Sequence, residues 1–323
     1  MGIIKETFWG RKPAKIQTLC IIAGVVIVAF APFYATAYAP LFLAWILTYS
    51  VMAISWTFFS GKTGYVSLAS GAFYGLGMYL QAAFGSNLPL PVSMIVAAAI
   101  SFGAAFGVGI ITLRLRGIYF TIFTFGLALF LNKFLHWFEA KFFHTKGRMV
   151  ISHDNTTVFF AVLVVFVIVL AVMMLLNKSR FGLALNCIGQ NEDSAQHVGV
   201  NTTMTKVLAF AISAAPVGAV SAVMASTIGY VDPDIAFNLL ASFFPVLMAI
   251  FGGMYSMYGP IVGAVVFYSL QNYLLRTTSL YMVIFGTAMV VVVLVMPKGI
   301  FGVVEMIFNK RRRGYDGEVI GDV

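Results

Sequence analysis

Residues 157–177 read "TVFFAVLVVFVIVLAVMMLLN", an apolar run without a charged side chain. A helix that crosses the hydrocarbon core of a bilayer needs about 20 mostly apolar residues, because each helical residue advances about 1.5 Å. A helix of this length that is apolar all around belongs in a membrane or in a large core. The run therefore predicts a transmembrane helix.

Similar runs recur along the whole chain. They predict an all-α, polytopic membrane protein with about ten transmembrane helices, because helices satisfy their own backbone hydrogen bonds in lipid. The transmembrane domain covers 19–297, between an N-terminal segment 1–18 and a basic tail 298–323. The number of spans between 237 and 275 stays open. The predicted spans are 19–36, 41–59, 64–84, 92–113, 118–138, 157–177, 207–229, 237–252, 259–275 and 280–297.

The composition excludes an ordinary soluble domain. Hydrophobic residues make up 61% of the 323 residues and charged residues only 10%, whereas soluble domains carry roughly 25% charged residues. The formal net charge of +9 lies between apolar runs, which is typical of membrane-flanking residues rather than of a nucleic-acid-binding surface. The two cysteines predict no disulfide framework and no cysteine metal site. We expect a lipid bilayer and no nucleic acid as partner.

The placement of the basic residues predicts the orientation. With a cytoplasmic N-terminus, most of the 20 lysines and arginines face the cytoplasm, as the positive-inside rule requires. Both termini are then cytoplasmic. Basic residues within 5–15, the apolar run 19–33 and the small residues 35–37 also imitate a cleavable signal peptide. The ten-span count and the charge balance favour an uncleaved first span.

The chain shows no energy source of its own. The tripeptide "GKT" at 61–63 resembles the end of a phosphate-binding loop, but Trp56 stands where that loop needs its first glycine. None of the 11 acidic residues lies in a predicted span, which argues against proton coupling. The same absence argues less strongly against sodium coupling, because backbone carbonyls can bind sodium. No serine, cysteine or histidine arrangement indicates catalysis. We therefore predict that the chain forms a transport pathway without an energy-coupling site of its own, and that it is not an enzyme.

Three histidines lie near the end of the fifth span. Their spacings of eight and nine residues match no helical pair of metal ligands, so we predict loop or interface histidines and no metal site. They are His136, His144 and His153.

Small and polar residues also form stripes within the spans. Pairs of glycines four residues apart predict close helix packing, because close backbone approach supplies attraction between helices in lipid. These pairs are Gly71 and Gly75, Gly103 and Gly107, and Gly259 and Gly263. Polar side chains on one helix face predict either hydrogen bonds between helices or a water-filled translocation path, and both interpretations stay open. These residues are Thr121, Thr124 and Asn132 in the fifth span, and Asn238 and Ser242 in the eighth.

Residues 178–206 form the most polar stretch, "KSRFGLALNCIGQNEDSAQHVGVNTTMTK", and are predicted to be cytoplasmic. Asn191 can cap a short helix, and Glu192 and Asp193 suit the positive N-terminus of that helix. Gly199 can end the helix in a left-handed conformation. Taken alone, this pattern is also compatible with a solvated connection between two spans.

Five stretches together resemble the permease subunits of branched-chain amino acid ABC importers, in particular the second, M-type permease. They are "GYVSLASGAFYGLGMY" (64–79), "LRLRGIYFTIFTFG" (113–126), "SRFGLALNCIGQNEDSAQHVGVN" (179–201), "FGGMYSMYGPIVGA" (251–264) and "MPKGIFG" (296–302). The resemblance covers roughly 41–304. It implies the type II, vitamin B12 importer-like permease fold and a location in the inner membrane of a prokaryote.

The resemblance also implies partners. The chain would form half of a transmembrane pathway beside a second permease subunit, which is either a different chain or a second copy. An extracytoplasmic solute-binding protein would deliver the solute, and two ATP-binding cassette ATPase subunits would hold ATP and Mg, so this chain itself binds no cofactor. The polar loop would contain the coupling helix that docks on an ATPase. Glu192, Asp193, Ala195 and Gly199 match its core by position; we expect Ala195 and Val198 to pack on the partner and the two acids to pair with its basic groups.

The solute is less well defined than the class of transporter. Branched-chain or other hydrophobic amino acids are expected, but "HTKGRMVI" (144–151) differs from the glycine-rich polar stretch that is common in the family. Permeases for urea, short amides and aromatic acids share the resemblance. Two other classes remain as alternatives: a stand-alone channel, which would not need the 178–206 loop, and a sodium-driven carrier, whose uptake would follow the ion gradient without ATP.

Overall fold

The computed structural model describes residues 38–85, 88–115, 117–144, 147–254 and 258–277, with a few isolated positions between 283 and 290. The first and last predicted spans, 19–36 and 280–297, lie outside these continuous ranges. The terminal segments 1–18 and 298–323 lie outside them as well.

The described chain is almost entirely helical. The longer helices are α2 (Ala39–Trp56) with the π-helix η1 (Thr57–Gly61), α4 (Leu90–Thr112), α5 (Ile118–Phe138) with the π-helix η2 (Glu139–Phe143), α6 (Asn155–Lys178) and α9 (Thr202–Ala225). The others are α3 (Ser70–Phe84), α7 (Arg180–Gln190), α8 (Glu192–His197), α10 (Pro233–Ala236), α11 (Leu240–Gly252) and α12 (Gly259–Thr277). Two short strands, β1 (Arg148–Met149) and β2 (Tyr230–Val231), pair antiparallel.

Among the described residues, six helical segments are long and apolar enough to cross a membrane. They are Ala39–Gly61, Leu90–Thr112, Ile118–Phe142, Asn155–Lys178, Thr202–Ala225 and Pro233–Gly252. Each overlaps one predicted span. The structure therefore supports a multi-pass, all-α membrane protein. The predicted span 259–275 is also a helix, α12, although it is not among these six.

The prediction of a continuous helix over 64–84 is wrong in its first part. Helix α3 begins only at Ser70, and residues 64–69 are not helical. Gly64 adopts a φ of +75°, the conformation with which glycine commonly ends a helix, and its N–H donates to the carbonyl of Ser60 at 3.1 Å. The stretch contains enough apolar residues to predict a membrane span. A count of apolar residues does not detect a local interruption of the helix.

Capping side chains begin several of the helices. The Asp154 carboxylate accepts from the Thr156 N–H at 3.1 Å at the start of α6. The Asn201 side chain accepts from the Met204 N–H at 3.1 Å at the start of α9. These side chains satisfy backbone donors that have no partner within the helix.

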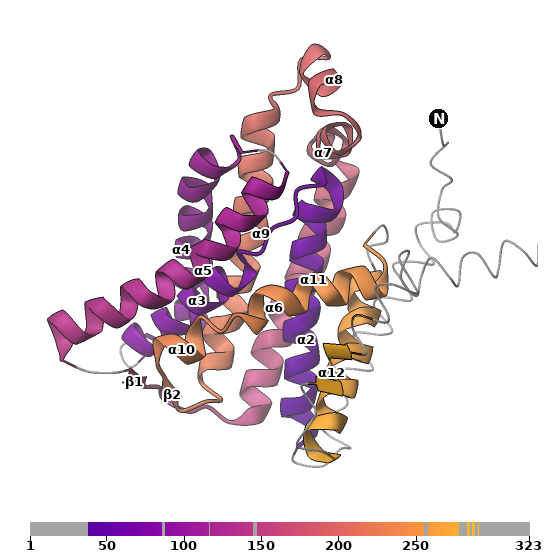
Figure 1. Ribbon diagram of the computed structural model, residues 1–323. Coiled ribbons are helices and arrows are strands. Elements are labelled where there is room, and N and C mark those ends of the chain that lie inside the picture. The colour runs from indigo at the N-terminus through magenta and orange to yellow at the C-terminus, as the bar shows by residue number, and fades with distance from the viewer. Residues whose placement is uncertain are drawn as a thin grey trace, which may run out of the picture.

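Helices α7 and α8 lie together at one end of the molecule, called here the α8 end (Figure 1). The strands β1 and β2 and helix α10 lie at the opposite end, and α11 crosses the middle region. The strand register pairs Arg148 with Val231 and Met149 with Tyr230. This sheet joins the loop before α6 to the segment after α9.

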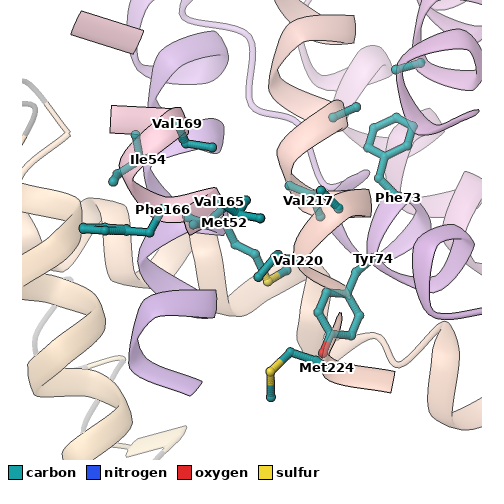
Figure 2. Close-up of a cluster of buried hydrophobic side chains, with 14 of the residues drawn as sticks. Met52, Ile54, Phe73, Tyr74, Val165, Phe166, Val169, Val217, Val220 and Met224 are labelled. Carbon is teal, nitrogen blue, oxygen red and sulfur yellow. The ribbon is translucent and has the colours of Figure 1, made fainter. Parts of the chain in front are cut away.

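The largest apolar core lies among α2, α3, α6 and α9. Figure 2 shows side chains from all four helices meeting, including Met52 of α2, Tyr74 of α3, Val165 of α6 and Val220 of α9. Of the six candidate spans, α9 has the largest buried share, at 78%. Helix α9 is therefore the central element of the described fold.

Two of the three predicted glycine pairs lie at close helix contacts. A Cβ at Gly71 would lie 2.4 Å from the Ser242 hydroxyl, and one at Gly75 would lie 2.3 Å from the Phe237 ring. A Cβ at Gly263 would lie 1.9 Å from the Met248 carbonyl oxygen. Close by, a Cβ at Gly252 would lie 1.8 Å from the Gly259 carbonyl oxygen, so α11 and α12 also approach closely.

The third pair behaves differently. Within the described chain, no atom lies within 4 Å of a Cβ built at Gly103 or Gly107. Helix α4 instead buries a face of small residues at four-residue spacing, which includes Ala97, Ser101 and Ala105. Gly103 and Gly107 therefore lie on a face of α4 that no described helix covers, and their packing against another helix stays a prediction.

Candidate functional site

The predicted coupling segment forms a capped helix. The Asn191 side chain accepts from the Ser194 N–H at 2.9 Å, and Gly199 adopts a φ of +91° just after α8. Both local predictions are confirmed. Helix α7 was not predicted, although its buried residues Gly182, Leu185 and Ile188 recur with helical spacing and gave a signal for it.

Helix α8 exposes one side and buries another. Val198 is 84% exposed and Asp193 is exposed, so both are accessible at the α8 end. Ala195 is buried at 4% exposure, which contradicts the expectation that it packs on a partner. It lies on the side of α8 that faces the rest of the chain.

Glu192 pairs within the chain. Its carboxylate lies 2.5 Å from the Lys206 Nζ and accepts from the Tyr65 hydroxyl at 2.6 Å. Lys206 also donates to the Leu113 carbonyl at 3.4 Å, and its side chain is only 3% exposed. This pairing contradicts the expectation that Glu192 binds a partner's basic group, because the carboxylate is already paired within its own chain and separating a buried ion pair leaves an uncompensated charge.

Sequence reasoning missed Lys206 and Tyr65 as parts of this site. Lys206 ends the polar stretch 178–206 directly before an apolar run, a position typical of a membrane-flanking cation. Tyr65 lies 127 residues before Glu192, so no local pattern connects the two. A lysine directly preceding an apolar span was the only signal in the sequence.

The non-helical segment, residues 64–69, is held by side chains of its neighbours. The Trp56 Nε1 donates to the Ser67 carbonyl at 2.7 Å, and the Ser67 N–H donates to the Ser60 hydroxyl at 3.2 Å. Backbone groups outside a helix need such partners in a membrane protein, because lipid offers no hydrogen bonds.

Two residues of the predicted translocation path complete this support. The Thr121 hydroxyl donates to the Val66 carbonyl at 2.8 Å, and the Leu68 N–H donates to the Thr124 hydroxyl at 3.1 Å. Thr124 is fully buried. The structure thus gives these threonines hydrogen bonds between segments, and their place in a path stays a prediction.

The remaining predicted path residues hold α10 and α11. The Asn132 amide donates to the Pro233 carbonyl at 2.9 Å and to the Asp234 carboxylate at 3.1 Å. The Ser242 hydroxyl accepts from the Gly71 N–H at 3.1 Å, where the first turns of α3 and α11 meet. The exposed Asn238 accepts from the Leu240 N–H at 2.9 Å.

A small cavity lies beside the non-helical segment. Its volume is about 10 Å³, close to the room that one water molecule requires. Four serine hydroxyls and several apolar side chains surround it, so the cavity has the polar partners that a buried water needs. The lining residues are Trp56, Phe59, Ser60, Ser67, Ser70, Phe73, Phe210, Ser213 and Val217.

We expect Thr124→Val to destabilise the protein. Valine keeps the shape of threonine but removes the acceptor of the Leu68 N–H, and an unsatisfied buried donor costs about 1–3 kcal/mol. The midpoint of thermal unfolding in detergent should fall, whereas Thr124→Ser should retain the hydrogen bond and unfold closer to the wild type. Equal midpoints for wild type and Thr124→Val would contradict this role of the hydroxyl.

Helix α7 contacts the chain just before the non-helical segment, residues 64–69. A Cβ at Gly189 would lie 1.9 Å from the Lys62 carbonyl oxygen, so α7 lies directly against the chain that precedes the non-helical segment. Burial lowers the pKa of Lys62 below its ordinary value. The Thr63 hydroxyl donates to the Phe59 carbonyl at 2.8 Å, and "GKT" therefore closes a helix instead of forming a phosphate-binding loop.

The described residues contain no group of three or more histidine, cysteine or acidic side chains that could hold a metal ion. Of the three histidines near the end of the fifth span, His136 lies in α5, and its Nε2 is 3.1 Å from the Asp234 carboxylate. This contact lies at the opposite end of the molecule from α8, so the histidine does not belong to the candidate coupling site.

The chain is similar to several known permeases. It is 25% identical over 322 residues to the high-affinity branched-chain amino acid transport system permease protein LivM of Salmonella typhimurium, covering 88% of this chain and 75% of that protein. It is 26% identical over 286 residues to the corresponding permease protein LivH of Escherichia coli, covering 79% of this chain and 91% of that protein. It is also 27% identical over 130 residues to the xylose transport system permease protein XylH of Haemophilus influenzae, covering 39% and 35%.

No solved structure matches the chain. Residues 39–293 match the family described as branched-chain amino acid transport system / permease component. This range includes every described span, the α7–α8 region and the non-helical segment. The chain therefore belongs to the family of permease components of branched-chain amino acid transport systems.

Proposed function

We propose that this chain is a permease subunit of an ATP-binding cassette importer and forms half of the transmembrane pathway for a small solute. The observation that supports this proposal most strongly is α8, a capped helix at the α8 end of the molecule. Asp193 in this helix and Val198 directly after it are exposed, in a chain that belongs to a permease family. An exposed, rigid helix at the end of a transmembrane bundle suits docking to a partner that supplies energy.

The proposal includes the partners of such a system. A second permease subunit completes the pathway, two ATPase subunits bind ATP and Mg, and an extracytoplasmic protein delivers the solute. The similarity to both LivM and LivH supports a pair of different permeases, with this chain in the LivM position because the match to LivM covers more of it. We further propose the type II permease fold.

Branched-chain or other hydrophobic amino acids are the proposed solutes, on the names of the family and of the relatives. Urea, short amides and aromatic acids are the second candidates, because the 144–151 stretch departs from the common family pattern. A thermal-shift screen of the partner binding protein against leucine, urea and aromatic acids distinguishes these solutes.

The proposal is tested by purifying this chain with its partner chains and reconstituting the complex in liposomes. Uptake should require ATP and the binding protein, and should not change when the sodium gradient is abolished. Uptake that follows the sodium gradient without ATP would instead establish a carrier, and uptake with neither would establish a channel.

We expect residues 152 and 309 to lie on opposite sides of the membrane. In a variant lacking Cys20 and Cys187, single cysteines at Ser152 and Asn309 should react with impermeant thiol reagents from opposite sides, since both termini are proposed to be cytoplasmic. A cysteine at the exposed Val198 serves as control and should react from the same side as Asn309. Labelling of Ser152 and Asn309 from one side would contradict the proposed topology.

A further inference from the structure

We propose that Glu192, Lys206 and Tyr65 form the connection through which a movement of α8 reaches the non-helical segment, residues 64–69. This inference rests on the proposed function, because it assumes that α8 receives the force of a partner. It assigns positioning roles to Lys206 and Tyr65, which lie outside the predicted coupling helix.

The three side chains connect three parts of the chain. One oxygen of the Glu192 carboxylate lies 2.5 Å from the Lys206 Nζ in α9, and the other accepts from the Tyr65 hydroxyl at 2.6 Å. The Lys206 Nζ also donates to the Tyr65 hydroxyl at 3.2 Å and lies 4.5 Å from the centroid of its ring. Each member therefore contacts both of the others.

Burial makes this connection stiff. The side chains of Lys206 and Glu192 are only 3% and 16% exposed, so water does not readily replace either partner. Separation of a buried ion pair leaves an uncompensated charge, which is strongly unfavourable. A displacement of α8 therefore either carries Tyr65 and the start of α9 with it or separates the pair at a large cost.

The far side of the connection is suited to movement. Residues 64–69 have no helical hydrogen-bond ladder, and side chains such as Trp56, Thr121 and Thr124 satisfy their backbone groups one at a time. Individual hydrogen bonds of this kind can exchange without unfolding a helix. Non-helical backbone at membrane depth also occurs where it is buried in protein or lines a cavity.

The segment leads directly to the small cavity described above. Ser67 stands two residues after Tyr65 and lines this cavity together with Ser60, Ser70 and Ser213. A shift of Tyr65 therefore changes the positions of hydroxyl groups in the interior. Through this route the position of α8 determines the geometry beside the first turn of α3.

The contact between α7 and Lys62 is a competing route, since Gly189 lies against the Lys62 carbonyl. The two routes differ in chemistry. The α7 contact depends on backbone packing alone, whereas the proposed connection depends on a carboxylate, an ammonium group and a hydroxyl. Substitutions that remove charge or the hydroxyl and keep volume affect only the proposed connection.

The test uses the complete importer reconstituted in liposomes, and measures solute uptake, ATP hydrolysis and their ratio. The double variant Glu192→Gln/Lys206→Met removes both charges without leaving one unpaired, and Tyr65→Phe removes only the hydroxyl. Lys178→Met makes the same chemical change at an exposed lysine and serves as control. We expect the double variant to lower uptake per ATP by on the order of fivefold or more, the lower range of coupling between sites.

Tyr65→Phe should lower the ratio of uptake to ATP hydrolysis less than the double variant does. Lys206→Arg keeps the charge and should also show a higher ratio than the double variant. A ratio equal to that of Lys178→Met in both the double variant and Tyr65→Phe would overturn the proposal. A proportional loss of uptake and hydrolysis would also overturn it, because that result indicates only structural damage. If the double variant does not assemble, Tyr65→Phe decides alone. Failure of the proposed function is distinguishable, because the wild-type complex would then show no ATP-dependent uptake.

Discussion

Gly77→Val is expected to prevent stable folding of this protein. A Cβ at Gly77 would lie 2.1 Å from the Gly218 carbonyl oxygen and 2.2 Å from the Ser221 hydroxyl. The first of these atoms is backbone of α9, so the clash is relieved only if α3 and α9 separate. Overpacking of a tight interior typically costs 1–3 kcal/mol and occasionally more. At these distances we expect about 3 kcal/mol or more.

The measurement is the yield of monodisperse protein in detergent and its midpoint of thermal unfolding. Gly103→Val is the matched control, because it makes the same change within a helix where the described chain leaves open space. This control should fold with a midpoint close to the wild type, since only the modest helix propensity of valine changes. Equal behaviour of the two variants would show that the α3–α9 contact does not limit stability.

Gly199→Val is expected to leave the protein folded in the membrane but to abolish its coupling to the ATPase. Gly199 adopts a φ of +91°, and a β-branched residue in a left-handed conformation costs about 1–2 kcal/mol. Among the described residues, no atom lies within 4 Å of a Cβ at this position, so the expected strain comes from the backbone and not from a clash. The turn after α8 should therefore rearrange, and with it the exposed surface around Val198.

Co-purification with the ATPase, followed by an assay of ATP hydrolysis stimulated by loaded binding protein, measures this effect. Gly199→Asn is the control, because asparagine tolerates left-handed backbone better than valine does and should retain more activity. Asp193→Lys should also impair assembly, since it reverses the charge of an exposed residue of α8. If Gly199→Val and Asp193→Lys both assemble and respond normally, α8 is only a solvated connection.

Much of the architecture could be predicted because transmembrane helices depend on a local property, the apolar length of the chain. The prediction for 118–138 coincides with α5, and the one for 157–177 lies within α6. Helix ends are similarly local, so Asn191 and Gly199 were correctly assigned. The interruption at 64–69 was missed, because its backbone depends on partners such as Thr121 and Thr124, more than 50 residues away.

The amino-acid sequence by itself determined that the chain crosses a membrane repeatedly, where α8 begins and ends, and which family it belongs to. These features depend on transfer of apolar residues into lipid, on capping within a few residues, and on the order of short motifs. Only the tertiary structure decided that Glu192 faces Lys206 and Tyr65, that Ala195 is buried, and that Gly103 packs against no described residue. The free energy of those contacts comes from groups distant in the sequence, and their proximity exists only after the helices have packed together.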